Sequence, residues 1–329
     1  MSAPLVVLGE VKTCLVPSAV ALVREEAAQL LALMPGRAVS WRERPGSVAI
    51  SPSLAAGVDC ATRLHRDGRA PAPVRIVGTV AGRALVTGGR ILQSSVYTRI
   101  VRSGDRMRQP WSHYLSRKGV TEAIDVVPPD PVRAGTALAE GYHLDRAAGA
   151  GEGILDLDAI SDRLLVRVRG DSRLDQSPPV QVGVTRLCWS AVIGGSAGPK
   201  VTMHLPGERV RSVRLVLREE SEIRAAQRFC EELAAHDWLL TVLTETLEQA
   251  DLFDVLSPQY LDLIEPLVRH FSGLWMPGMH TPKSLRALWK PLQSDPGFTQ
   301  QWNALRERLH DTIAIATLRA ANKDTAPGW

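Results

Sequence analysis

The stretch EESEIRAAQRFCEELAAHDWLLTVLTETLEQ, residues 219–249, decides the predicted fold. Its large apolar side chains and one histidine recur three or four positions apart, at Phe229, Leu233, His236, Leu240, Leu243 and Leu247. This spacing places them on one face of an α-helix, because a helix completes a turn in about 3.6 residues. The stretch is therefore predicted to form a helix of about eight turns with one buried side.

Three further helices are predicted after this one. Ser257 suits the N-cap of the first and Pro258 its first position, while Pro266 is expected to kink it. The second covers residues 284–292, and the third carries another apolar stripe, at Phe298, Trp302, Leu305, Leu309, Ile313 and Ala316. Residues 219–325 are thus predicted to form an all-α part of about four helices.

The first hundred residues have mainly the pattern of β-strands. β-Branched and alternating apolar residues between glycine-containing turns predict an antiparallel arrangement of strands, over 4–16, 73–80, 83–89 and 90–102. One early helix is predicted over 18–36, with Ser18 as its N-cap.

The middle of the chain is predicted to begin with a long connection, because residues 128–153 are rich in Pro and Gly. A helix over 156–168, with Asp158 as N-cap, and a three-stranded meander over 182–217 are expected to follow. The predicted fold class is α+β: a mixed, mainly antiparallel N-terminal β-rich part, then an all-α C-terminal part. The predicted domains are 1–127 with a basic face, 128–218, which is either separate or continuous with the first, and 219–325.

Composition limits the class of protein. No stretch approaches the roughly 20 apolar residues of a membrane helix, and the N-terminus lacks the basic segment of a signal peptide. The four cysteines have no paired spacing, and the eight histidines show no metal-binding motif. We therefore expect a cytoplasmic protein with no metal, no cofactor and no membrane partner.

Charge is strongly segregated along the chain. Residues 60–118 carry twelve Lys or Arg against two acids, Asp67 and Asp105, a net charge of +10. Residues 219–329 carry ten bases against sixteen acids, a net charge of −6. Such segregation indicates an anionic partner for the basic segment. An alternative is that the basic middle docks on the acidic helical part of its own chain.

The segment RQPWSHYLSRKG, residues 108–119, lies at the end of this basic region. Pro110 and Gly119 suit the two ends of a short helix over 111–118. An anion site is predicted around it, formed by Arg99, Arg102, Arg106, Arg108, Arg117 and Lys118. Aromatic side chains for stacking a base are predicted at Tyr97, Trp111 and Tyr114. The alternative, an ordinary solvated surface, has equal support.

Two histidines are candidates for acid–base chemistry. His113 lies among the cations of this segment, and His236 precedes Asp237 in the long helix. The alternative for His236 is a core histidine whose ring nitrogens are satisfied by hydrogen bonds. No catalytic residue is assigned.

Five short segments carry a resemblance: LGEVKTCL (8–15), RQPWSHYL (108–115), HDWLLT (236–241), LWMPG (274–278) and GFTQQW (297–302). Together they resemble an uncharacterised family of actinobacterial proteins over nearly the whole chain. Genes of this family lie in a cluster beside a variant P-loop protein and a methyltransferase-like protein. The resemblance implies a subunit of a multi-protein system and offers no catalytic residue to transfer.

Three functions follow as hypotheses. The first is a non-enzymatic interaction subunit that works with the other proteins of its gene cluster. It would bind nucleic acid or a nucleotide-bearing protein through the Arg-rich middle. The second is an enzyme that acts on a phosphorylated or nucleotide substrate with a histidine as acid or base. The third is a pure protein adaptor that docks through the acidic helical part.

Overall fold

A single mixed β-sheet runs through the structure, a computed structural model that describes residues 3–44, 46–66, 69–105, 107–148, 153–194, 198–253 and 257–324. Its central strand, β1 (Pro4–Leu15), pairs antiparallel with β6 (Ile91–Arg102) on one side and with β8 (Thr185–Ile193) on the other. All twelve residues of β1 are buried. The nearly continuous apolar run at its start fits a strand that is covered on both faces.

The sheet has ten strands, in the order β2-β3-β5-β7-β6-β1-β8-β10-β9, with β4 paired to β5. Neighbouring strands are antiparallel except for β6–β7 and β8–β10, which are parallel. The other strands are β2 (Ser40–Arg42), β3 (Val48–Ile50), β4 (Leu54–Arg66), β5 (Arg69–Thr87), β7 (Val120–Ala123), β9 (Lys200–His204) and β10 (Val210–Leu217).

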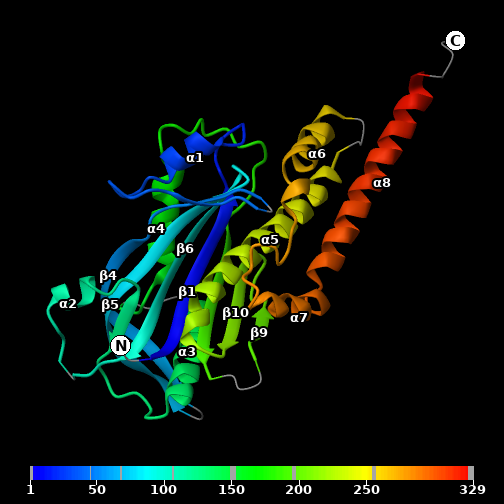
Figure 1. Cartoon of the computed structure of the whole chain (residues 1–329). Helices are drawn as coiled ribbons and strands as arrows, with labels where there is room; N and C mark the ends of the chain where they lie inside the picture. Colours follow the sequence, from blue (N-terminus) through cyan, green and yellow to red (C-terminus); the bar gives the residue numbers. More distant parts are fainter. Residues whose placement is uncertain are drawn as a thin grey trace.

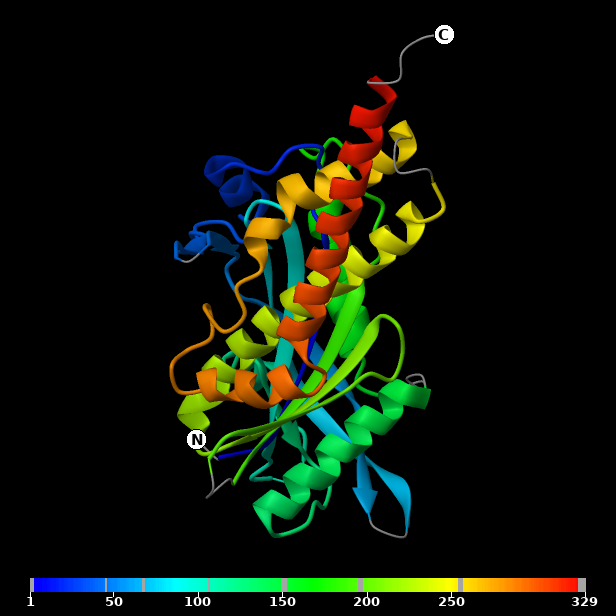
Figure 2. The same cartoon turned by 90° about the vertical axis from the view of Figure 1, so that its right-hand side faces the viewer.

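Helices cover both faces of this sheet (Figures 1 and 2). Two helices, α3 and α4, pack against one face, and α5 packs against β1, β6 and β8 on the other. The helices α6, α7 and α8 form an outer layer around α5. The helices are α1 (Arg24–Leu30), α2 (Trp111–Leu115), α3 (Pro131–Ala148), α4 (Leu157–Arg169), α5 (Ile223–Ala250), α6 (Pro258–His270), α7 (Trp289–Ser294) and α8 (Phe298–Asp324).

The predicted fold class, a β-rich part followed by an all-α part, was wrong. Helices are interspersed among the strands, because α3 and α4 lie between β7 and β8 in the chain and cover the face opposite α5. Strands from the ranges 1–127 and 128–218 also belong to one sheet, since β8 pairs directly with β1.

The three-stranded meander predicted over 182–217 was also wrong in its order. The last strand, β10, lies between β8 and β9 and runs parallel to β8. Every second residue of β10 is buried, at Arg211, Val213, Leu215 and Leu217, whereas no residue of β9 is buried. The strand with the apolar face therefore takes the inner position, and β9 lies at the edge.

The Pro- and Gly-rich connection predicted over 128–153 contains an 18-residue helix, α3. Its glycines mark close contacts with the sheet. A Cβ atom at Gly135 would lie 2.1 Å from the carbonyl oxygen of Leu5, and one at Gly141 would lie 2.0 Å from that of Arg63. Glycine at these positions lets the helix backbone touch the strand backbone, so the residues that indicated a loop are packing residues.

The apolar stripe predicted in the long helix is confirmed. Phe229, Leu233, Leu240 and Leu247 of α5 are all buried, in a core cluster shared with Trp189 of β8. A second core cluster, with Leu8 and Leu138, lies between the sheet and α3. Figure 1 shows α5 against the sheet, with α6 and α8 on its far side.

The start of α6 is as predicted. Ser257 is the N-cap, its Oγ accepts a hydrogen bond from the backbone N–H of Tyr260 at 3.2 Å, and Pro258 lies in the first turn. We expect Ser257→Ala to lower the free energy of unfolding by about 1 kcal/mol, because one N–H of the first turn loses its acceptor. Urea unfolding measures this effect. Ser257→Asp, which keeps an acceptor, should restore the stability; equal losses for both variants would contradict the capping role.

Candidate functional site

The arginines of β6 are bonded within the chain. Arg99 lies 3.5 Å from Glu220, in the turn before α5. Arg102 donates to the backbone carbonyls of Val127 and Pro128, at 3.2 and 2.5 Å. Two members of the predicted anion site therefore already have acceptors.

The polar side of α2 forms a small charged cluster. Arg117 forms an ion pair with Glu122 of β7, and Nε2 of His113 lies 2.9 Å from the same carboxylate. Lys118 is exposed, and Arg106 lies outside the described residues. The carboxylate of Glu122 thus occupies the place that an external anion would take beside Arg117.

The predicted stacking residues differ in their exposure. Tyr114 is buried, and its hydroxyl accepts a hydrogen bond from the N–H of Gln109. Trp111 is 37% exposed and packs edge to face against Tyr114, with Arg108 above its ring at 4.9 Å. Tyr97 is half-buried against the core cluster around α5. Of the three, Trp111 has the most exposed ring, and a cation of the protein already covers it.

Other cations of the basic segment are also neutralised internally. Arg83 makes two hydrogen bonds of 2.8 Å to the buried carboxylate of Glu231 in α5. Arg75 and Arg108 share Asp59, at 3.0 and 3.3 Å. Contacts to Glu220 and Glu231 join the basic middle to the acidic helical part of the same chain, which was one of the alternatives predicted from the sequence.

His236 is buried and belongs to α5, a helix that lies away from α2 (Figure 1). Its Nδ1 donates to the carbonyl of Glu232 at 2.8 Å, and its Nε2 accepts from the N–H of Met276 at 3.0 Å. Burial lowers the pKa of His236 to about 4. Both ring nitrogens are thus occupied by the backbone, so the ring holds the segment after α6 against α5. The structure does not bring His113 and His236 together in one site.

A well-formed concave site lies elsewhere, between α5, α6 and α8. It has a volume of about 410 Å³, within the usual range of binding pockets. We name it the α6–α8 groove. It is lined by Leu239, Val242, Leu243, Leu267, Val268, Phe271, Trp275, Thr299, Trp302, Asn303, Arg306, Leu309, His310 and Ile313.

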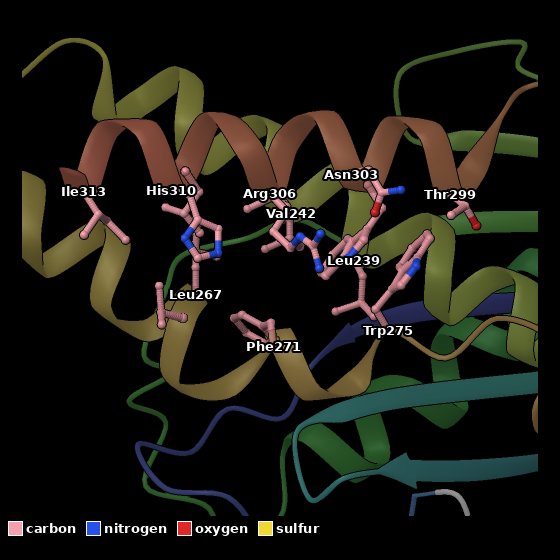
Figure 3. Close-up of a pocket in the computed structure, with 14 residues that line it drawn as sticks. Leu239, Val242, Leu267, Phe271, Trp275, Thr299, Asn303, Arg306, His310 and Ile313 are labelled. Carbon is pink, nitrogen blue, oxygen red and sulfur yellow. The ribbon is translucent and has the colours of Figure 1, made fainter. Parts of the chain in front are cut away.

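The floor and walls of the α6–α8 groove are mostly apolar (Figure 3). Leu239 and Val242 of α5 form the floor, and Leu267 and Phe271 of α6 form one wall. One end is formed by two stacked indole rings, Trp275 and Trp302, whose centroids are 4.5 Å apart. This end is rigid, because each ring is fixed by the other.

Polar groups of the groove lie along α8. Thr299, Asn303, Arg306 and His310 are spaced by four, three and four residues, so they share one side of the helix. None of the described residues that line the groove is an Asp or a Glu. Arg306 and His310 are exposed, and neither has an ion-pair partner among the described residues. The groove therefore combines an apolar floor with a basic edge.

The groove was not predicted from the sequence, although a signal was present. The apolar stripe of α8 that begins at Phe298 was predicted, but the row of polar residues beside it was not. Apolar side chains are also exposed next to the groove: Val268 is 43% and Leu261 52% exposed on α6, and Ile313 is 39% exposed on α8. An exposed apolar patch next to a polar edge is typical of an interaction surface.

Comparison with known proteins identifies no relative: no family model, no curated protein and no solved structure matches the chain. Within the described residues, no helix has the length and apolarity needed to cross a membrane. The same part of the chain contains no group of three or more His, Cys, Asp or Glu residues arranged to hold a metal ion.

Proposed function

We propose that this chain is a non-enzymatic interaction subunit that binds an amphipathic helix of a partner protein in the α6–α8 groove. The observation that carries this proposal is the groove itself: an apolar trough of about 410 Å³ that is edged by Arg306 and His310 and contains no acid. Large apolar side chains of the partner would fill the floor. A carboxylate of the partner would pair with Arg306.

A helix fits this trough better than a compact small molecule does. Two helices, α6 and α8, border the groove, and their exposed apolar residues Val268 and Ile313 continue its floor toward solvent. Helices pack against one another by placing rows of side chains into such grooves, at interaxial distances of about 8–10 Å. The occupant is therefore expected to carry apolar anchors one helical turn apart.

The resemblance to the actinobacterial family indicates which partner proteins to test. It implies a multi-protein system with a variant P-loop protein and a methyltransferase-like protein. The proposal keeps the interaction role expected from the sequence and moves the binding surface from the Arg-rich middle to the helical layer. Nucleic-acid binding by that middle stays a prediction, and the internal ion pairs of Arg83, Arg99 and Arg117 weaken it.

Binding to the two cluster proteins tests the proposal. At least one of them is expected to bind the purified chain, and Ile313→Asp or Val268→Asp should weaken binding roughly 30-fold. A central interface side chain contributes about 2 kcal/mol or more, which corresponds to that factor. Titration calorimetry of the separately purified proteins, after nuclease treatment, is the measurement.

The matched control is Val166→Asp. Val166 is 59% exposed on α4, on the opposite face of the sheet, so its replacement should leave the affinity unchanged. Arg306→Glu is expected to slow association and to reduce its salt dependence. Equal binding by wild type and Ile313→Asp, or no binding of either protein, would exclude the proposed site.

A further inference from the structure

The outer edge of β4 carries backbone groups that point away from the sheet. Within the described residues, β4 forms a ladder with β5 alone. The backbone groups of Ala61 point away from β5. Its N–H donates to the carbonyl oxygen of Gly153 at 2.8 Å, and its carbonyl oxygen accepts from the N–H of Leu155 at 2.7 Å. Alternate residues of an antiparallel strand point their backbone groups to the same side, so Ala55 and Gly57 point outward like Ala61. Within the described chain, no backbone group bonds to these outward groups of Ala55 and Gly57.

The contact at Ala61 demonstrates that this edge accepts an extended segment. Residues 153–155 lie beside it, and Ile154 forms a parallel bridge with Ala61. At Ala61, the outward N–H and C=O groups of β4 are thus bonded within the chain. The outward groups of Ala55 and Gly57 lie along the same edge and have no backbone partner among the described residues. A row of such groups is a template for strand addition.

A second hollow lies beside this edge, between β4 and α4. It has a volume of about 290 Å³, and we name it the β4–α4 groove. The hollow is open because its lining includes three small residues, Ala55, Ala56 and Gly82, which leave room for other side chains. Its remaining lining is formed by Leu54, Val80, Val96, Ile160, Arg163, Leu164 and Arg167.

Two arginines give the β4–α4 groove its charge. Arg163 and Arg167 are one turn apart on α4, and both are exposed. Arg167 donates to the carbonyl of Leu33 at 3.3 Å. Arg163 has no hydrogen-bond or ion-pair partner in the described part of the chain, and no acid lines the groove. An occupant with a carboxylate therefore complements this site.

We propose that the β4 edge and the β4–α4 groove together bind an extended acidic segment of a partner protein as an additional strand. Backbone groups of the segment bond to Ala55 and Gly57, as residues 153–155 do to Ala61. One apolar side chain of the segment enters the groove, and an acidic side chain pairs with Arg163 and Arg167. This site is separate from the α6–α8 groove and does not depend on the function proposed for it.

A second copy of the chain fits this edge less well. Pairing two β4 edges would bring the arginine pairs of both copies to one interface, where like charges repel. Acidic peptides carry the opposite charge and add a strand without this repulsion. Self-association is therefore an outcome that the experiment must distinguish from peptide binding.

Random heptapeptides displayed on phage are the probe for this site. Selection on the full chain should enrich peptides with alternating β-branched residues and at least one acid. Once such a peptide is bound, hydrogen exchange at the amides of Ala55 and Gly57 should slow at least tenfold. Fluorescence anisotropy with the labelled peptide should give at least tenfold weaker binding for Ala55→Pro and for Arg163→Ala.

The test variant Ala55→Pro removes only an outward N–H, and proline is tolerated on edge strands, so this variant should fold. Two further variants serve as controls. Arg169→Ala removes an exposed arginine of the same helix outside the groove and should bind normally. Ile313→Asp, in the α6–α8 groove, should also bind the peptide normally, so failure of one site is distinguishable from failure of the other.

The proposal is overturned by any of three results. The first is that enriched peptides leave exchange at Ala55 and Gly57 unchanged. The second is that they bind Ala55→Pro as well as the wild type. The third is that sedimentation shows a dimer of the wild type that Ala55→Pro dissociates, which would assign the edge to self-association.

Discussion

Asp237→Ala is expected to lower the free energy of unfolding by about 3–5 kcal/mol, because it leaves a buried arginine without its carboxylate. Arg211 of β10 donates to Asp237 of α5 at 2.7 Å, and the two residues are 8% and 5% exposed. The guanidinium also bonds to the carbonyls of Gly207 and Glu208, which fix it in place. When Asp237 is removed, these carbonyls still hold the guanidinium in a largely buried position, where its charge has no carboxylate beside it. Urea unfolding followed by circular dichroism measures the loss.

A neighbouring ion pair provides the control. Arg209 and Glu245 connect the same two parts of the fold at a distance of 3.0 Å, but their side chains are 47% and 26% exposed. Glu245→Ala should therefore lower the free energy of unfolding by no more than about 1 kcal/mol, since solvent screens the pair and hydrates the remaining charge. Equal losses for Asp237→Ala and Glu245→Ala would mean that burial does not determine the contribution of these pairs.

The second large effect is a loss of stability as the pH falls from 6.5 toward 5. Burial lowers the pKa of His143 to about 3 and the pKa values of His236 and His280 to about 4. In the unfolded chain these groups take up protons near pH 6.5, whereas in the folded chain they stay neutral. The unfolded state thus binds more protons, and the stability present above pH 6.5 is lost on acidification.

The free energy of unfolding is expected to depend steeply on pH in this range. Each such histidine contributes up to about 1.4 kcal/mol per pH unit, so the three together contribute up to about 4 kcal/mol per unit. Burial also raises the pKa values of Glu232 and Asp237, and the protons that these carboxyls take up in the folded chain act with the opposite sign. Urea midpoints, converted to free energies at several pH values, measure the slope.

Two variants compare the contribution of a buried histidine to this slope with that of an exposed one. His236→Gln should remove about one third of the slope, whatever its effect on stability at neutral pH, because one titrating group is lost. His310→Gln, which replaces a ring that is exposed on α8, is the matched control. An unchanged slope for His236→Gln would show that this histidine is not protonated differently in the two states.

Local features of the fold were predictable where neighbours in sequence determine them. The stripe of α5 follows from one-sided burial, and the N-cap of α6 follows from Ser257 and Pro258. Strand order was not predictable in this way, because β1 pairs with β8 across more than 170 residues, and no local pattern specifies that contact. The glycines of α3 misled the prediction because a contact with another backbone and a loop both require glycine.

The candidate site was predictable only in part, for a similar reason. The excess of arginine in residues 60–118 was visible, but its acceptors were not: Glu231 pairs with Arg83 from 148 positions away. The α6–α8 groove is a gap between three helices, so its existence depends on how α8 is placed relative to α6. Periodicity identifies the faces of each helix but not the space between helices.

The position of β1 at the centre of the sheet has a consequence for synthesis on the ribosome. The strand leaves the ribosome before the other strands of its sheet, yet one of its two edges must wait for residues 185–193. At translation rates of about 5–20 residues per second, that wait lasts roughly 10–35 s. During it, the nascent polypeptide presents an apolar edge that is liable to aggregate, so folding cannot be completed until the second half of the chain has emerged.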